Sequence, residues 1–222
     1  MIIDLISDLH GHYPEIEGGD LLIVAGDLTA RDLPFEFLKF LLWLDKQKYR
    51  RKIFIGGNHD NMIQEISCPS NTLPDNTEYL CDSGTQFEGL KMWGSPWTKT
   101  FEGMNPHCKA FTVDTEEELA EKWALIPDDV DILITHSPPA FILDDVLRKI
   151  IVDTNGNKIK KYEHCGSESL REFVFKVSPS LHIFGHIHER GGSLSGESIK
   201  FINASHVNER YEPVNPPLRV IL

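Results

Sequence analysis

The sequence predicts an α/β domain in which strands and helices alternate along the chain. Short apolar runs rich in Ile, Val and Phe recur from one end of the chain to the other, and each is followed by small or polar turn residues. These runs are too short for helices and are typical of buried strands. Several are separated by segments with helical spacing and helix caps, and alternating strands and helices favour a layered α/β architecture.

Seven runs are expected to form strands, because each combines apolar residues with a turn signal at its end. They cover residues 2–6, 21–25, 53–55, 132–134, 181–184, 199–202 and 218–222. A turn at Asn155-Gly156-Asn157 indicates a β-hairpin as well, with residues 151–152 and 158–161 on either side.

Three helices are predicted from caps and hydrophobic spacing. Pro34 suits the first position of a helix, and residues 35–43 are apolar over much of the helical circumference, so we expect this helix to be deeply packed. Thr115 begins a capping box followed by three glutamates, which predicts a second helix running towards Trp123. A third helix is expected over residues 167–177.

Length and composition restrict the class of protein. The chain has 222 residues, which fits one domain, 1–222, with a core large enough to fold without disulfides. With 41% hydrophobic and 25% charged residues, the disordered, collagen-like and disulfide-scaffold classes are excluded. There are 22 Lys and Arg against 34 Asp and Glu, a net charge of −12. Such an acidic surface repels polyanions, which argues against long nucleic acid as a partner.

Targeting signals and cysteine spacing favour a cytoplasmic protein. Met1 leads directly into a strand-like run, without the basic and long apolar regions of a signal peptide. The longest apolar stretch, residues 40–44, is far too short to span a bilayer, so no membrane partner is expected. The four cysteines show no C-x-x-C spacing and are interpreted as reduced thiols.

Polar side chains follow five of the predicted strands at the point where each strand ends. The segments are Ser7-Asp8-Leu9-His10, Gly26-Asp27, Gly57-Asn58-His59-Asp60, Thr135-His136-Ser137 and Gly185-His186-Ile187-His188. In an open α/β sheet the strand ends line one crevice, so we expect these side chains to converge.

The converging side chains offer oxygen and nitrogen ligands without a thiolate, which suits Mn, Fe or Zn better than Ca or a structural zinc site. The candidate ligands are Asp8, His10, Asp27, Asn58, His136, His186 and His188. Seven ligands are too many for one ion, whereas two ions roughly 3.5–4 Å apart that share a carboxylate would use them all. A lone Asp or His at a strand end is most often a turn or helix cap, but five such segments in this order favour a metal centre.

The same five segments resemble the signature of the calcineurin-like metallophosphoesterases, across about residues 8–188. Other segments resemble the fetal-brain metallophosphodiesterase subfamily of that superfamily, as does the short connection between Asp8 and Asp27. These segments are 94–98, 131–139, 203–205 and 213–217. The resemblance implies a four-layer α/β/β/α sandwich with a dinuclear metal centre at the strand ends.

The resemblance also implies roles for the candidate ligands. Asp8, His10 and His188 would hold one ion, Asn58, His136 and His186 the other, and Asp27 would bridge them. Some animal relatives carry Gly in place of His186, which weakens their metal site, so this chain is expected to have a fully ligated, active centre. Mn²⁺ is the expected ion, with Fe and Zn as alternatives.

Two divalent ions would lower the pKa of a bridging water and neutralise charge on the phosphoryl oxygens. The expected reaction is in-line attack of the metal-bridging hydroxide on phosphorus. The resemblance makes His59 the catalytic histidine that stabilises or protonates the leaving oxygen, with Asp60 orienting its ring. Five further residues are candidates for substrate contact: His12, Arg31, Trp97, Asn203 and Asn208. Of these, Trp97 could stack on a base or pack in the core.

We therefore expect a metal-dependent phosphodiesterase that acts on small phosphodiesters or nucleotides, with 2′,3′- or 3′,5′-cyclic nucleotides as the class that the resemblance suggests. A phosphomonoesterase of the protein phosphatase type is the first alternative, because Arg31 follows Asp27 by four residues as in that motif, although Ala30 and Asp32 depart from it. A nuclease is disfavoured by the charge, and a non-catalytic scaffold by the filled ligand positions. The sequence leaves a homo-oligomer open.

Overall fold

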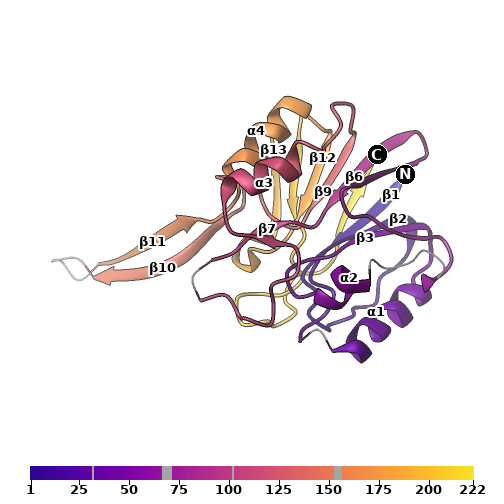
Figure 1. Ribbon diagram of the computed structural model, residues 1–222, viewed down its shortest axis with the longest axis horizontal. Coiled ribbons are helices and arrows are strands. Elements are labelled where there is room, and N and C mark those ends of the chain that lie inside the picture. The colour runs from indigo at the N-terminus through magenta and orange to yellow at the C-terminus, as the bar shows by residue number, and fades with distance from the viewer. Residues whose placement is uncertain (32, 67–71, 102, 153–156) are drawn as a thin grey trace.

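Two β-sheets pack face to face in the computed structural model, which describes residues 1–31, 33–66, 72–101, 103–152 and 157–222 (Figure 1). The first sheet has the order β15-β1-β2-β3-β4 and the second the order β13-β14-β12-β9-β6-β5. The first consists of β1 (Ile2–Ile6), β2 (Gly19–Ala25), β3 (Tyr49–Ile55), β4 (Thr77–Tyr79) and β15 (Leu218–Ile221). The second consists of β5 (Ser83–Phe87), β6 (Leu90–Ser95), β9 (Ile132–Thr135), β12 (Leu181–Phe184), β13 (Gly192–Ser195) and β14 (Lys200–Asn203).

Helices cover the outer faces of both sheets. Helices α1 (Pro34–Lys46) and α2 (Asn61–Ile66) pack on the first sheet, whereas α3 (Glu116–Trp123) and α4 (Glu168–Val177) pack on the second (Figure 1). The order of layers is therefore α/β/β/α, which confirms the four-layer sandwich. A short pair, β7 (Thr98–Lys99) and β8 (Thr112–Val113), lies between β6 and α3 in the chain.

Successive side chains of a strand point to opposite faces of the sheet, and in the central strands both faces are buried. In β2, Leu21 and Ile23 point into the core between the sheets, while Leu22 and Val24 pack under α1. The central strands are buried on both sides, so their sequences are continuous apolar runs rather than alternating ones. All seven predicted strands are present, within a few residues of the expected bounds.

The remaining strands lacked a strong apolar signal in the sequence. Strands β4 and β5 are half-exposed and rich in polar residues, so their pairing depends on the neighbouring strand more than on their own composition. The predicted hairpin is confirmed by β10 (Asp145–Val152) and β11 (Lys158–His164), which pair antiparallel. Asn155 and Gly156 of its turn lie outside the described residues.

The three predicted helices are present, but the expectation that α1 is deeply packed was wrong. Phe37, Phe40 and Leu44 are buried against the sheet, whereas Leu38 and Leu42 are more than half exposed. The helix contacts the sheet along one stripe only, and its outer face has no covering layer among the described residues. Thr115 caps α3 through the amide of Glu118, and Ser167 caps α4 through that of Leu170.

Three of the four cysteines can be assessed in the structure. Cys81, Cys108 and Cys165 are free thiols, in agreement with the expectation, and Cys68 lies outside the described residues. In the described part of the chain, no helix has both the length and the apolar character needed to cross a membrane.

Candidate metal centre

The five polar segments meet at one edge of the two sheets. Strands β1, β2 and β3 run parallel in the first sheet, and β9 and β12 run parallel in the second. Their carboxyl ends lie together because the sheets join beyond β1, where the amide of Ser7 donates to the carbonyl of Ala204 at 2.8 Å. The side chains that follow these strands converge there, as expected for ligands at the carboxyl ends of parallel strands.

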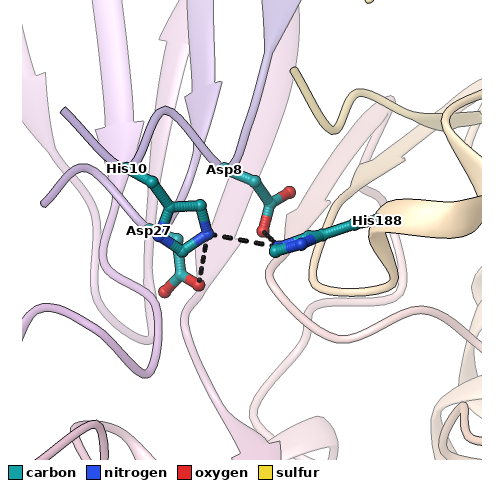
Figure 2. A group of neighbouring side chains, drawn as sticks. All are labelled: Asp8, His10, Asp27 and His188. Atoms are coloured by element: carbon teal, nitrogen blue, oxygen red, sulfur yellow. Dashed lines mark hydrogen bonds and ion pairs between the residues drawn. The ribbon is translucent and has the colours of Figure 1, made fainter. Parts of the chain in front are cut away.

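One group of ligand atoms is formed by Asp8, His10, Asp27 and His188, which Figure 2 shows facing one another. Each offers one atom, and all four atoms lie within 4.8 Å of one another. His10 Nε2 is 3.2 Å from His188 Nε2 and 3.5 Å from Asp27 Oδ2, and His188 Nε2 is 3.3 Å from Asp8 Oδ1. The group is enclosed, since Asp8, His10 and Asp27 are at most 4% exposed.

A second group lies on the other side of Asp27. His136 Nε2 is 3.3 Å from Asp27 Oδ1 and 3.2 Å from the side-chain oxygen of Asn58. The His186 ring lies 5.1 Å from that of His136, and its Nε2 faces Thr98 Oγ1 at 3.2 Å. Asp27 therefore turns one carboxylate oxygen towards each group.

The chemistry of these atoms fits divalent cations. Burial opposes ionisation of Asp27, but His136 and His59 outweigh it and hold the pKa of this carboxyl well below its usual range. Burial lowers the pKa of His10 to about 3 and that of His186 to about 3, so both rings are neutral. Carboxylates and neutral imidazoles are the forms that bind metals. The carboxylate oxygens and imidazole nitrogens of Asp8, His10, Asp27 and His188 converge in a buried space, and such an arrangement favours a cation between them.

His136 differs from His10 and His186 in its protonation. Burial disfavours a proton on its ring, but the carboxylates of Asp27 and Asp8 raise the pKa of His136 to about 9. Its Nδ1 is 3.0 Å from the carbonyl oxygen of Ala25, which leaves Nε2 towards Asp27. A metal at Nε2 must therefore displace a proton from His136.

The backbone around the centre is strained in a way that aims the side chains. Asp8, His10, Asp27 and His186 all have positive φ, between 42° and 69°. This conformation costs a non-glycine residue roughly 1–3 kcal/mol and persists only where the surroundings hold it. The Asp8 carboxylate accepts hydrogen bonds from the amide of His186 at 3.1 Å and from Ser205 Oγ at 2.7 Å, which fixes its direction.

Two glycines leave room for the ligands. A Cβ on Gly185 would lie 2.8 Å from Ser7 Cβ and closer still to a carboxylate oxygen of Asp8. A Cβ on Gly57 would lie 2.8 Å from His136 Cε1 and closer to Asp27 Oδ1. Ordinary van der Waals contacts begin at 3.4 Å. The glycines of the strand-end motifs are thus needed for close approach of the ligands.

The structure corrects the expected partner of His59. The Nδ1 atom of His59 lies 3.0 Å from the carbonyl oxygen of Ala30 and 3.3 Å from Cys108 Sγ, and its Nε2 is 4.0 Å from Asp27 Oδ2. These contacts, rather than Asp60, orient the ring. Burial opposes its protonation, but Asp27 and the bonds to Cys108 and Ala30 raise the pKa of His59 to about 10.

Asp60 instead holds the turn that carries Asp27. Its carboxylate accepts hydrogen bonds from the amides of Leu28, Thr29 and Gly57 at 2.9–3.1 Å. Burial and the nearby charge of Asp27 raise the pKa of Asp60 to about 7, although these donors work in the opposite direction. The side chain therefore ties the turn after β2 to the turn after β3.

A pocket of about 440 Å³ extends from the metal centre to the base of the β10–β11 hairpin. Its inner end is lined by His186, His188 and Tyr211, and its outer end by Arg148 and Cys165. Its volume lies in the usual range for small-molecule sites, roughly 300–1,000 Å³.

Tyr211 is a residue that the sequence did not single out. Its ring lies 4.8 Å from that of His10, 5.2 Å from that of His188 and 6.2 Å from that of His59, and its φ is 60°. Asn208 organises this turn, because its side-chain oxygen accepts from the amides of Arg210 and Glu212. The sequence signal for Tyr211 was weak, because it consists of an aromatic residue two positions before Pro213.

None of the five candidate substrate residues is among the described residues that line this pocket. Asn203 donates to the carbonyl oxygens of Leu143 and Ile187 and is fully buried, and Asn208 holds the turn of Tyr211, so both have structural contacts instead. Trp97 is partly buried, donates to Asp82 at 2.7 Å and packs against the edge of the core, which favours the packing interpretation. His12 and Arg31 are exposed, and substrate contact by them stays a prediction.

The fold and the site together define a class, an α/β/β/α protein with side chains at its strand ends that could hold metal ions. A family model described as calcineurin-like phosphoesterase matches residues 1–190. The chain belongs to the calcineurin-like phosphoesterases, and the family supports a metal-dependent phosphoesterase activity.

Individual relatives agree with this membership. The chain is 36% identical to metallophosphoesterase domain-containing protein 1 of Homo sapiens, with 98% of this chain and 69% of the relative covered, and the Mus musculus protein of that name gives the same values. UPF0046 protein T07D4.2 of Caenorhabditis elegans is 30% identical, with 90% of this chain and 54% of the relative covered. One solved structure aligns with a TM-score of 0.62 at 13% identity over 94% of this chain and 91% of its own, which supports the fold alone.

Proposed function

We propose that this protein is a phosphodiesterase that hydrolyses small phosphodiesters, with 2′,3′- or 3′,5′-cyclic nucleotides as the substrate class. The proposal rests on the pocket that opens from the metal centre. The pocket is large enough for a nucleotide, and Tyr211 and Phe101, each about half exposed, offer aromatic faces to a base.

The charge of the pocket supports a diester over a monoester. Its lining contains two cations, Lys99 and Arg148, and Arg148 is paired with Glu163 at 2.6 Å. Four glutamates line the same pocket: Glu116, Glu163, Glu189 and Glu209. A monoester carries close to two negative charges at neutral pH and a diester carries one, so the acidic part of the lining, away from the proposed ions, repels the monoester more strongly.

We propose that Asp8, His10 and His188 hold one ion, that Asn58, His136 and His186 hold the other, and that Asp27 lies between them. Mn²⁺ is the proposed ion, with Fe or Zn as alternatives, because the ligand atoms are nitrogen and oxygen only. Bound divalent ions would activate a water and neutralise charge on the phosphoryl oxygens.

The chain's own residues supply the rest of the proposed chemistry. His59 lies beside Asp27 with its Nδ1 held by Ala30, so its Nε2 faces the centre and can give a proton to the leaving oxygen. Asp60 acts as a positioning residue, since it holds the turn that carries Asp27. Tyr211 closes one side of the centre and limits where the substrate can lie.

The test is to load the purified protein with Mn²⁺ and compare hydrolysis of bis-p-nitrophenyl phosphate with that of p-nitrophenyl phosphate. Asp27→Ala serves as the blank, because it removes the carboxylate that both ligand groups share. Faster cleavage of the diester, lost in the blank, would support the proposal and lead to a panel of cyclic nucleotides.

A preference for the monoester would favour the phosphatase alternative, for which Arg31 would be the next residue to replace. Metal binding without activity on either ester would favour the non-catalytic scaffold. A nuclease stays the least supported alternative, since the chain carries a net charge of −12.

We further propose that residues 1–222 form one domain and that the protein acts in the cytoplasm on small molecules rather than on membranes or long nucleic acid. The shared core between the two sheets and the acidic composition support this setting.

A further inference from the structure

The β10–β11 hairpin projects away from the two sheets as an arm (Figure 1). The term arm refers to residues Asp145–Val152 and Lys158–His164. All seven residues of β11 and the last six of β10 are exposed. An isolated two-stranded hairpin is marginally stable in water unless a face packs against another surface. We therefore expect a face of this long, exposed arm to pack against another surface.

The register of the arm places four of its six exposed large apolar side chains on one face, and the paired Ile151 and Ile159 lie on the other. Leu147 pairs with Tyr162, Ile150 with Lys160 and Val152 with Lys158. Residues that pair directly lie on the same face, and residues two apart on β11 share that face. This face, called the apolar face of the arm, consists of Leu147, Ile150, Val152, Tyr162, Lys158 and Lys160. Its four apolar members are 37–62% exposed, which is unusual for a surface that contacts only water.

The arm is also basic within an acidic chain. Residues 145–164 contain five Lys and Arg and three Asp and Glu, so of the 22 and 34 in the whole chain, 17 and 31 lie outside the arm. Lys149 and Lys161 lie directly opposite each other, where like charges destabilise a strand pair. In the described part of the chain, no ion pair involves Lys149, Lys158, Lys160 or Lys161. Among the residues that the structure describes, these four lysines of the arm therefore lie without an ion-pair partner beside exposed apolar groups.

We propose that the arm binds the acidic body of a second copy of this chain. The body has the opposite charge to the arm, and complementary charge steers association and disfavours arm-to-arm contact. Apolar contact by Ile150 and Val152 would add the burial that surface charges alone do not provide.

Helix α3 is the receiving surface that the geometry favours. Its outer residues Glu117, Glu118 and Glu121 are exposed, and its inner residue Leu119 lines the same pocket as Val146 at the base of the arm. A two-fold axis that lays one arm along the α3 helix of the other copy therefore brings the second arm to the first α3. The result is a closed dimer in which two equal contacts form together.

The arm is long enough for this contact. Its longer strand has eight residues, which span roughly 26 Å at about 3.3 Å per residue. A standard interface buries roughly 800 Å² on each partner, and in a symmetric dimer both arm contacts add to this buried area. The inference does not depend on the proposed substrate, because the arm residues that it uses do not line the pocket at the metal centre: Ile150, Val152, Lys158 and Lys160.

Sedimentation velocity of the full chain over a range of concentrations tests the inference. The wild-type protein is expected to sediment as a dimer of 25.3 kDa chains, and the dimer should weaken as salt is added. Lys158→Glu with Lys160→Glu reverses the two lysines of the apolar face and should raise the dimer Kd about tenfold or more. Lys39→Glu with Lys46→Glu on α1 is the matched control with the same change in net charge, and it should remain dimeric.

A second variant, Ile150→Ser with Val152→Ser, removes apolar contact without changing charge and should also favour the monomer. Circular dichroism checks that each variant is folded. A wild-type protein that stays monomeric at every concentration would overturn the inference, and so would an arm variant that dimerises as well as the control. Arm-dependent retention of a monomer on anionic vesicles or on RNA would overturn it too, by showing that the arm's partner is a polyanion.

Discussion

Gly185→Ala should release metal from the centre without unfolding the protein. Gly185 follows β12 and lies against Asp8, whose carboxylate is held by the amide of His186 and by Ser205. A Cβ at this position would lie 2.8 Å from Ser7 Cβ, where ordinary contacts begin at 3.4 Å. Relief of the Ser7 Cβ contact alone needs a shift of roughly 0.6 Å. The Ser7 hydroxyl oxygen and a carboxylate oxygen of Asp8 would lie closer still, so both side chains must move by more than this.

That displacement is large for a metal ligand. Ligand distances in metal sites are normally held within about 0.2 Å, and disturbing the groups that orient a ligand typically costs 10–100-fold in metal affinity. Overpacking of this kind costs about 1–3 kcal/mol of stability, which a domain of this size tolerates. We therefore expect a folded variant whose Mn²⁺ affinity is about 10–100-fold weaker.

The assay is titration calorimetry with Mn²⁺, combined with elemental analysis of the bound ions and a thermal melt. Gly196→Ala is the matched control, because its Cβ would meet only Ile199 O at 3.2 Å and Phe201 at 3.8 Å, away from the centre. A folded Gly185→Ala protein with the metal content and affinity of the wild type would refute the placement of Asp8 as a ligand.

Three further predictions concern single side chains. His59→Ala should keep its bound metal but lose about 10²–10⁴-fold in turnover, so loss of metal in elemental analysis would count against its role as a proton donor. Burial lowers the pKa of His182 to about 3, so below its unfolded value of 6.5 the unfolded chain binds a proton that the native state does not. Through this residue, the free energy of unfolding should fall by about 1.4 kcal/mol per pH unit from pH 6.5 towards 3. Denaturant titrations at several pH values would contradict this if the free energy of unfolding depended on pH in His182→Gln as it does in the wild type. Tyr211→Ala should raise KM for the diester several-fold while Tyr211→Phe changes it little, because the contact is through the ring; equal effects in steady-state kinetics would exclude a ring contact.

Most of the metal centre could be predicted from the sequence, because its residues follow strands whose apolar pattern is local. Asp8, Asp27 and His136 each come directly after a strand that is recognisable from its own residues. Parallel strands bring their carboxyl ends to one edge, so the convergence follows from the strand pattern together with the sheet type. The glycines beside these ligands were visible in the same motifs.

The partners of those residues could not be predicted in the same way. Asp60 was expected to orient His59, its neighbour in the chain, but its carboxylate turns to the amides of Leu28 and Thr29 after another strand. Which donor a carboxylate meets depends on how two turns are placed in space, and sequence adjacency carries little information about this.

Contacts across the fold also decided which surfaces are covered. The sequence of α1 is apolar around much of its circumference, yet only one stripe meets the sheet and Leu38 stays exposed. The hairpin was visible as a turn between two short runs, but its projection as an arm depends on the absence of a neighbouring layer among the described residues.

The sequence by itself determined the α/β class, most strands of the two sheets and the seven candidate ligands, because hydrophobic period and strand-end chemistry are local properties. Only the tertiary structure decided that Asp27 faces two groups of ligands, that Tyr211 lies against His10 and His188, and that the arm stands clear of the body. These features join residues that are far apart in the chain, and such pairings are set by the packing of the two sheets, which no single segment encodes.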